Sequence, residues 1–404
     1  MTFYPLNDEE QLILDTVRDF ARERVAPRAA EIDSTGEFPW DLVKQMGDLG
    51  LMGVCLPEEY GGAGQSYVLF AMIVEELCKA CASTGLILDV NISLCAEPIL
   101  LFGNEEQKKR FLTPLATGEK LGALAITEPE AGSDAAGIRT SAVRQGDSYV
   151  LNGSKIFITN GGVADTYVVT AVTDREAGHK GITDFVMEKG MPGLSFGQPM
   201  HKMGINGSAT TEVFFDNVVV PVENRLGDEG MGFKITMDTL DGGRIGIAAQ
   251  AVGIAQSALD DAVAYIQQRK QFGKRIADFQ AVQFMVADMA TQIEAARLLT
   301  LQAAALRQQN IPCARESSMA KLFAGDIAVK VATDALQLFG GYGYIKEYPA
   351  ERHMRDAKIC QIYEGTQQIQ RMVIGRSLLD GRKDVPKPAG KTQARELAGA
   401  GVAK

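Results

Sequence analysis

The sequence predicts an α+β protein of several domains, in which an N-terminal helical domain and a C-terminal helical bundle flank a β barrel or sandwich. Three observations lead to this fold class. Apolar residues recur at helical spacing at both ends of the chain, short β-branched and aromatic runs fill the middle, and 404 residues exceed what one hydrophobic core normally supports. We place the domains at 1–120, 121–231 and 232–380, and expect a flexible tail at 381–404, which lacks apolar periodicity.

The N-terminal domain is predicted to be all-helical. Leu12, Val17 and Phe20 belong to a series of apolar residues that recurs near a 3.6-residue period. Further helices are expected at about 40–49, 67–82 and 84–102.

After Gly118 the pattern changes to short runs rich in β-branched and aromatic residues, separated by turns such as Asn160-Gly161-Gly162. Such runs over about 100 residues are typical of a compact β barrel or sandwich. The expected strands are 122–127, 141–145, 148–152, 155–159, 166–172, 183–188, 194–199 and 211–221.

Long alanine-rich helical patterns return from Gly232. Long amphipathic helices with short connections pack as a bundle. The segment Asp241-Gly242-Gly243-Arg244 is expected to open a helix, where its charges can bind the polar end of a substrate. The expected helices are 233–269, 278–308, 315–339 and 363–379.

The net charge of -10 argues against non-specific nucleic-acid binding, which needs a basic face. No stretch is judged to reach the roughly 18 apolar residues of a membrane span, and the N-terminus lacks the basic and apolar regions of a signal peptide. We therefore expect a cytoplasmic protein without a membrane span. The six cysteines and three histidines are too dispersed for a disulfide framework or a metal site, so no metal is expected.

Glu364 stands between an apolar, aromatic approach and a glycine, in Ile362-Tyr363-Glu364-Gly365-Thr366. A poorly solvated carboxylate has a raised pKa and is a competent base, and Gly365 lets a ligand approach the backbone. Proton abstraction next to a carbonyl requires such a base. The alternative is that this Glu-Gly pair simply ends a helix.

Two segments of the β domain can contact a flat, polar cofactor. Residues 126–134 offer the hydroxyls of Thr127 and Ser133 with free backbone amides, although a tight loop that caps its own backbone explains them too. In residues 155–161, Phe157 can cover a ring while Thr159 bonds its edge, and ordinary strand packing is the alternative.

Two segments of the bundle are typical of anion or nucleotide sites. Residues 269–275 place four cations at a helix end, either to meet a pyrophosphate or as favourable charge near a helix C-terminus. Residues 337–341 end a helix with two glycines, which suits a C-cap or the close approach of a ribose or phosphate. Neither segment is specific by itself.

Six motifs together make the chain, from about Leu6 to Leu379, resemble the acyl-CoA dehydrogenase family. The resemblance implies a helical domain, a β domain and a four-helix bundle, assembled as a homotetramer with one FAD per subunit and acyl-CoA as substrate. The motifs occur in the family's order: Thr127-Glu128-Pro129 with Gly132-Ser133-Asp134, residues 155–160, 241–244, 269–273 and 337–341, and Tyr363-Glu364-Gly365-Thr366.

The resemblance also implies the chemistry and the contacts. Glu364 would remove the α-proton of a short, branched or alicyclic acyl-CoA while the β-hydride moves to flavin N5, and electrons would pass to an electron-transfer flavoprotein. Some relatives carry the base at the position of Gly243, so glycine there indicates the short- and medium-chain branch. Substrate contacts are expected from Ser133, Asp241, Arg244, Tyr363 and Gly365. FAD contacts, partly across a subunit interface, are expected from Leu124, Ile126, Thr127, Gly132, Ser133, Phe157, Ile158, Thr159, Arg269, Gln271, Phe272, Phe279, Gln280, Gln337, Leu338, Gly340, Gly341, Thr366 and Gln368.

Two departures from the family pattern affect the expected substrate and partner. Phe157 stands where many relatives have tryptophan, and Asp89 lies on the helix that lines the acyl pocket in relatives, where small or neutral residues are usual. If Asp89 faces the pocket, it can be a second acid/base beyond the β-carbon, as a dehydrogenase of a cyclic or unsaturated acyl-CoA needs. Otherwise it is exposed or salt-bridged. An acyl-CoA oxidase, an enoyl-CoA reductase and a non-catalytic acyl-CoA-binding scaffold are the remaining alternatives.

Overall fold

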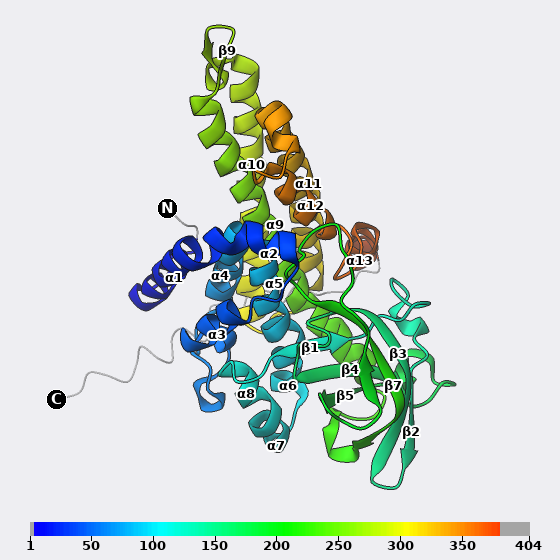
Figure 1. The fold of residues 1–404 in the computed structure, drawn as a ribbon. Helices are drawn as coiled ribbons and strands as arrows, with labels where there is room; N and C mark the ends of the chain where they lie inside the picture. The colour runs from blue at the N-terminus through cyan, green and yellow to red at the C-terminus, as the bar shows by residue number, and fades with distance from the viewer. Residues whose placement is uncertain (1–3, 380–404) are drawn as a thin grey trace, which may run out of the picture.

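The computed structural model describes residues 4–379 and contains helices, then a sheet, then long helices along the chain. The N-terminal helices lie beside the sheet, and the long C-terminal helices extend away from both (Figure 1). The predicted fold class is confirmed. The tail expected at 381–404 lies outside the described residues, and the domain limits stay a prediction.

The described part of the N-terminal region contains eight α-helices, of which α1 and α4 are the longest. α1 begins with a capping box: the Asn7 side chain accepts a hydrogen bond from the Glu10 backbone N–H at 2.8 Å, and the Glu10 side chain accepts one from Asn7 N–H at 3.1 Å. The helices are α1 (Asp8–Phe20), α2 (Ala29–Thr35), α3 (Trp40–Asp48), α4 (Tyr67–Ala80), α5 (Ala82–Asp89), α6 (Glu97–Phe102), α7 (Glu105–Gln107) and α8 (Thr113–Ala116).

The chain stays helical from Ala82 to Phe102, because a wider π-helical stretch at Val90–Ala96 joins α5 to α6. These 21 residues are long and apolar enough to cross a membrane by length and composition, so the expectation that no stretch qualifies was wrong. Within the apolar window, 83% is buried inside the protein. The stretch is therefore covered by the rest of this fold.

The middle region is one sheet of eight strands. The strand order is β6-β7-β3-β2-β4-β5-β8, and β1 pairs in parallel with β4. The strands expected at 148–152 and 155–159 form the single strand β3, because β7 pairs with both halves across two register shifts. The strands are β1 (Gly122–Ala125), β2 (Ser141–Gln145), β3 (Ser148–Thr159), β4 (Thr166–Val172), β5 (Ile182–Glu188), β6 (Leu194–Phe196), β7 (Thr210–Pro221) and β8 (Arg225–Leu226), which the sequence did not predict.

The C-terminal region is built on α9 (Gly232–Gln268), a helix of 37 residues. Asp241–Arg244 lies inside α9, so the expectation that it opens a helix was wrong. The residues from Gly242 to Gly253 are all buried, and packing on the neighbouring helices carries α9 through its glycines. The remaining helices are α10 (Gln280–Gln308), α11 (Ala314–Phe339), α12 (Ala350–Ile359), which was not predicted, and α13 (Gln367–Leu379).

One further expectation about this region is corrected, and one is confirmed. The helix expected from residue 363 begins only at Gln367, since Glu364 and Gly365 have positive φ angles. The cationic residues at 269–275 do lie at a helix end, as expected: Arg269 is the C-cap of α9, and the following residues form a hairpin of β9 (Lys270–Gln271) and β10 (Lys274–Arg275) (Figure 1).

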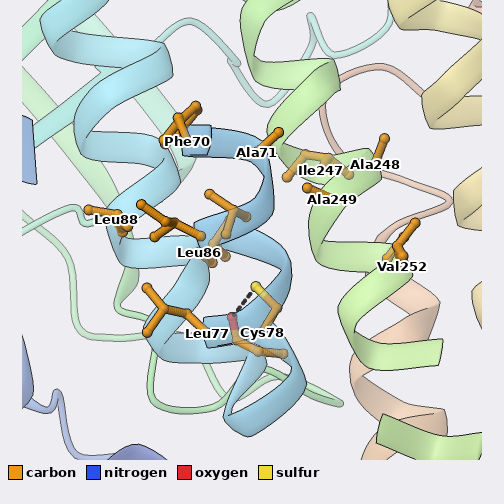
Figure 2. Close-up of a cluster of buried hydrophobic side chains, with 14 of the residues drawn as sticks. Phe70, Ala71, Leu77, Cys78, Leu86, Leu88, Ile247, Ala248, Ala249 and Val252 are labelled. Atoms are coloured by element: carbon orange, nitrogen blue, oxygen red, sulfur yellow. Dashed lines mark hydrogen bonds between the residues drawn. The ribbon is translucent and has the colours of Figure 1, made fainter. Parts of the chain in front are cut away.

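The largest hydrophobic core joins α4, α5 and α9 (Figure 2). On α9 this core is formed by small or β-branched residues such as Ala249 and Val252, all of them buried. A Cβ atom at Gly253 would overlap the α4 backbone, so the two helices approach at backbone contact distance. This close approach brings α5 against the first half of α9, where the candidate site lies.

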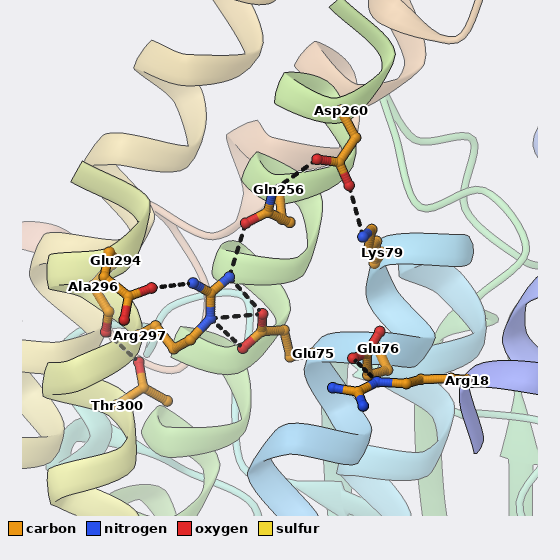
Figure 3. Close-up of polar contacts among 10 residues, drawn as sticks. All are labelled: Arg18, Glu75, Glu76, Lys79, Gln256, Asp260, Glu294, Ala296, Arg297 and Thr300. Atoms are coloured by element: carbon orange, nitrogen blue, oxygen red, sulfur yellow. Dashed lines mark hydrogen bonds and ion pairs between the residues drawn. The ribbon is translucent and has the colours of Figure 1, made fainter. Parts of the chain in front are cut away.

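An ion-pair network joins α4 and α9 to α10 (Figure 3). The guanidinium of Arg297 on α10 donates to both carboxylate oxygens of Glu75 on α4, at 2.8 to 3.2 Å, and to Gln256 on α9 at 2.9 Å. Both charged side chains are about four-fifths buried, at 22% and 16% exposure. Removing one partner leaves the other charge poorly solvated.

We therefore expect Arg297→Met to lower the free energy of unfolding by roughly 3 kcal/mol, because it leaves the Glu75 carboxylate buried without its cation. Denaturant unfolding followed by circular dichroism measures this loss. Arg22→Met is the matched control, since the Arg22–Asp19 pair is exposed and its loss should leave the unfolding midpoint unchanged. Equal effects of the two substitutions would contradict the structural role of the network.

Candidate active site

Glu364 lies in the loop between α12 and α13, in a left-handed backbone conformation. Its φ angle is 53°, and that of Gly365 is 89°. A non-glycine residue in this region costs on the order of 1–3 kcal/mol, which surrounding contacts must offset. The turn directs the Glu364 side chain at α9, where a Cβ atom at Gly243 would lie 2.7 Å from Glu364 Oε2. Any residue larger than glycine at 243 would therefore compete with the carboxylate for space.

Asp89, at the end of α5, reaches the same face of α9 one turn further along. Its side chain is 1% exposed, and a Cβ atom at Gly246 would overlap Asp89 Oδ1. Residues three apart on a helix share a face, so Gly243 and Gly246 receive the two carboxyl groups side by side. Asp89 is thus neither exposed nor salt-bridged, the two alternatives to a pocket-facing side chain.

Several polar atoms of this cluster are buried and have no partner among the described residues. They are Asp89 Oδ2, Glu364 Oε2 and Arg244 Nε. Asp89 Oδ1 accepts a hydrogen bond from the Ser93 hydroxyl at 2.9 Å, and Arg244 pairs with Asp241 at 2.5 Å. Buried polar atoms are almost always bonded, so three orphans converging on one place indicate a site for a polar ligand.

The pKa values of the two acids are both raised. Burial raises the pKa of Glu364 to about 7, against the opposing effect of the cations Arg244 and Lys321. Burial, and then the nearby Glu364 carboxylate, raises the pKa of Asp89 well above its ordinary value. The protonated form of Asp89 is therefore favoured compared with an ordinary aspartate, while Glu364 is poised between its two states near pH 7.

Gln250 lies on α9 one turn beyond Gly246, which faces Asp89, and it is bonded to Tyr363. The Tyr363 hydroxyl donates to the side-chain oxygen of Gln250, and the side-chain NH2 of Gln250 donates to the Ala82 backbone carbonyl at 3.3 Å. Sequence reasoning missed Gln250, because a glutamine inside a long helix gives no signal of the side chain that it meets.

The loop at residues 126–134 in the β domain is held by a buried ion pair between Lys155 and Glu128. Lys155, fully buried, donates to the Ile126 carbonyl and to Glu128 Oε1, both at 2.8 Å. The Glu128 carboxylate accepts from the backbone N–H groups of Arg139 and Thr140. The loop is therefore shaped from behind, with its outer residues left open: Gly132 and Ser133 are exposed, and Ile126 and Thr127 are half-buried.

Phe157 is 62% exposed and has a φ angle of 59°, which turns it out of the strand. Thr159 nearby is half-buried. Ile158 and Leu124 instead have side chains buried in hydrophobic cores, so only their backbone can contact a ligand.

The expected contacts at the far end of α9 surround a cavity of about 660 Å³. Phe272, in the hairpin, is 94% exposed and does not line it, nor do Phe279 and Gln280. Thr366 and Gln368 lie elsewhere, next to Glu364 at the start of α13. The cavity is lined by Tyr265, Arg269, Gln271, Ile276, Val282, Met285, Gln337, Leu338, Phe339, Gly340, Gly341, Tyr342 and Ile345.

Three family models match the chain. They describe the acyl-CoA dehydrogenase N-terminal domain at residues 7–119, the middle domain at 123–218 and the C-terminal domain at 230–379. Over 371 residues the chain is 54% identical to a short-chain specific acyl-CoA dehydrogenase of Clostridium acetobutylicum, and the match covers 92% of this chain and 98% of that protein.

Solved structures give the same match. Butyryl-CoA dehydrogenase from Megasphaera elsdenii superposes with a TM-score of 0.92 at 50% identity, over 94% of this chain and 100% of that one. A chain of a structure described as an electron transferring flavoprotein of Acidaminococcus fermentans matches with a TM-score of 0.92 at 54% identity and the same coverage.

The contact of Asp89 with Gly246 predicts a specific stability pattern. Gly246→Ala should destabilise the fold by about 1–3 kcal/mol, because its methyl group displaces the Asp89 carboxyl group. Asp89→Ala in the same chain removes the clash, so the double variant should be more stable than Gly246→Ala alone.

Denaturant unfolding measures both effects. Gly375→Ala in α13 is the matched control, since its Cβ atom meets no other group and the substitution should preserve or raise stability. Strictly additive effects at 89 and 246 would contradict the contact.

Proposed function

This chain belongs to the acyl-CoA dehydrogenase family and is an FAD-dependent acyl-CoA dehydrogenase, and on that premise we propose that Glu364 is its catalytic base. The observation that supports the assignment best is the Glu364 carboxylate itself. One of its oxygens is buried without a partner against Gly243, and its pKa lies near 7. A carboxylate with such a pKa is a stronger base than an ordinary glutamate, and about half of it is still ionised at pH 7 and ready to accept a carbon-bound proton.

Each residue near Glu364 has a distinct task in this proposal. Glu364 accepts the α-proton of the acyl-CoA thioester, and its backbone N–H donates to the thioester carbonyl, which makes that proton more acidic. Ser133, Asp241, Arg244, Tyr363 and Gly365 contact the substrate. FAD, when bound, supplies the acceptor for the β-hydrogen, which leaves as a hydride.

The residues present fit FAD in two places. The loop at 124–133 and the exposed ring of Phe157 suit the flavin end, and the 660 Å³ cavity suits the rest of the dinucleotide, since it is lined by six of the expected contacts: Arg269, Gln271, Gln337, Leu338, Gly340 and Gly341. Phe279, Gln280, Thr366 and Gln368 complete the proposed set.

The two FAD-binding regions support a homotetramer. The sheet packs on the first turns of α9, where the Thr236 hydroxyl donates to Asp184 at 3.2 Å, and the hairpin follows its last turn. A helix of 37 residues spans about 55 Å, so one FAD molecule does not reach both regions of a single chain. We therefore propose that each FAD is shared between two subunits.

We propose a short acyl-CoA as substrate and an electron-transfer flavoprotein as electron acceptor. Short-chain and butyryl-CoA dehydrogenases are among the similar proteins, and a similar chain comes from a structure described as an electron transferring flavoprotein. An acyl-CoA oxidase or an enoyl-CoA reductase would instead exchange electrons with oxygen or a reduced donor. We also propose that the protein is located in the cytoplasm.

The base assignment predicts that Glu364→Gln keeps FAD and acyl-CoA bound but abolishes flavin reduction, because an amide cannot accept the α-proton. Anaerobic mixing with butyryl-CoA and flavin absorbance measure the rate. Asp334→Asn, at a surface ion pair on α11, is the matched control and should reduce normally. Bleaching of Glu364→Gln at the wild-type rate would overturn the assignment.

A second candidate function is dehydrogenation of a cyclic or unsaturated acyl-CoA with Asp89 as a second acid/base. The observations that favour it are the burial of Asp89, its unpaired Oδ2 and its place beside Glu364. A buried carboxyl group without a cation costs stability unless it serves another purpose. A proton acceptor further along the acyl chain would allow proton loss beyond the β-carbon.

Asp89→Asn should then slow flavin reduction by cyclohexanecarboxyl-CoA or its unsaturated analogue by about 100-fold or more, while butyryl-CoA reacts at a near-normal rate. Ser93→Ala, which removes only the hydroxyl bonded to Asp89, should have a much smaller effect. Unchanged turnover of every acyl-CoA tested would exclude this role and leave Glu364 as the sole base.

A further inference from the structure

Lys321 on α11 is a buried cation that the proposed reaction does not yet use. Its side chain is 0% exposed, and its ammonium group donates to the Gly365 carbonyl oxygen at 2.6 Å and to the Gln367 side-chain oxygen at 3.2 Å. Among residues 4–379 it forms no ion pair within 4 Å. A buried lysine without a bonded carboxylate is unfavourable, so its place beside the Glu364 loop requires an explanation.

The partner of Lys321 is the strained turn that carries the base. Glu364 and Gly365 are consecutive residues with positive φ angles, and their carbonyl oxygens both point into the protein rather than into a helix. Gln370, fully buried on α13, donates to both carbonyl oxygens at 2.9 Å. Lys321 donates to the second one as well. Together they satisfy the two carbonyls that a left-handed turn leaves outside any regular hydrogen-bond ladder.

The same contacts join α11 to the start of α13. Gln367 donates to the Leu322 carbonyl at 2.7 Å and to Asp326 at 3.0 Å, next to the bond between its side-chain oxygen and Lys321. The Glu364 turn is therefore fixed directly before the first residue of α13. It cannot relax towards a helical conformation without breaking the bonds of Lys321 and Gln370.

We propose that Lys321 is a positioning residue for the Glu364 base, which holds the turn that aims the carboxylate at Gly243 and stabilises its ionised form by charge. This inference rests on the proposed function, in which Glu364 accepts the α-proton. Lys321 does not touch the substrate or the reacting atoms. It acts through the backbone of Gly365 and through the electrostatic field at Glu364.

The charged groups around Glu364 come from three helices. Arg244 approaches from α9, Asp89 from α5 and Lys321 from α11. Both cations lower the pKa of Glu364, which burial raises, while burial lowers the pKa of Lys321 to about 8. The charge of Arg244 is partly neutralised by its ion pair with Asp241, whereas Lys321 bonds only neutral oxygens. Loss of the Lys321 charge should therefore move the Glu364 titration upwards.

Two substitutions separate the charge from the hydrogen bonds. Lys321→Gln keeps a donor near Gly365 but removes the charge, whereas Gln370→Met removes the two hydrogen bonds and no charge. Lys321→Arg keeps the charge and provides the conservative rescue. The FAD-loaded enzyme is mixed anaerobically with butyryl-CoA between pH 6 and pH 9, and the carboxyl band of Glu364 is titrated by infrared difference spectroscopy, with Glu364→Gln as the reference that lacks it.

For Lys321→Gln we expect the Glu364 midpoint to rise by about one pH unit from its value near 7. Flavin reduction at pH 7 should then be roughly fivefold slower, because the ionised fraction falls from about one half to about one tenth, and it should largely recover at pH 9. Gln370→Met should slow reduction at every pH with an unchanged midpoint, and Lys321→Arg should keep the wild-type midpoint. An unshifted midpoint in Lys321→Gln, or the same shift in Gln370→Met, overturns the proposal. Flavin reduction by Glu364→Gln would instead overturn the proposed function itself.

Discussion

The missing side chains at Gly243 and Gly246 are the constraint on which the site depends. Glu364 and Asp89 come from different parts of the chain, and each ends in the space that a Cβ atom on α9 would fill. Because the two glycines lie on one face of a rigid helix, the two carboxyl groups are held in a fixed relation to each other. The glycines also run against helix propensity, so buried packing on both sides of α9 is needed to keep this stretch helical.

Electrostatic balance follows from this arrangement. Two carboxyl groups without bonded cations are difficult to ionise together in a buried space, and burial with the Glu364 charge raises the pKa of Asp89, which favours its protonated form. The positive charges of Arg244 and Lys321 oppose the effect of burial and hold the pKa of Glu364 at about 7. Both cations lose contact with water in this position. The site is thus built for one exchangeable proton. A neutral thioester can enter without adding a further charge to it.

Much of the fold follows from local patterns. The three compositional regions correspond to helices, sheet and helices, because apolar periodicity and turn residues are local signals. The helix expected from residue 363 began too early, since nothing local shows that Gln370 and Lys321 hold Glu364 in a left-handed turn. Asp241–Arg244 was misplaced for a similar reason: paired glycines indicate a helix boundary unless tertiary packing overrides them.

In the candidate site, too, residues with a local sequence signal could be predicted and residues defined by tertiary packing could not. Glu364 could be found because its sequence context is distinctive, and Asp89 because a carboxylate is unexpected in an apolar helix. Lys321, Gln250 and Gln370 could not, since each is an ordinary residue on a helix and acquires its partner only when the helices pack. The resemblance to a family supplied the expected FAD contacts, but not the burial of Leu124 and Ile158 or the exposure of Phe272.

The apolar stretch from Ala82 to Phe102 has a consequence for synthesis of the protein. One of the elements that cover it, α9, begins about 130 residues later in the chain. At a translation rate of roughly 5–20 residues per second, the stretch waits on the order of ten seconds or more for its partner. During that interval it presents the ribosome exit with a segment as apolar as a membrane helix. Chaperone capacity should therefore limit the yield of folded protein before the stability of the finished fold does.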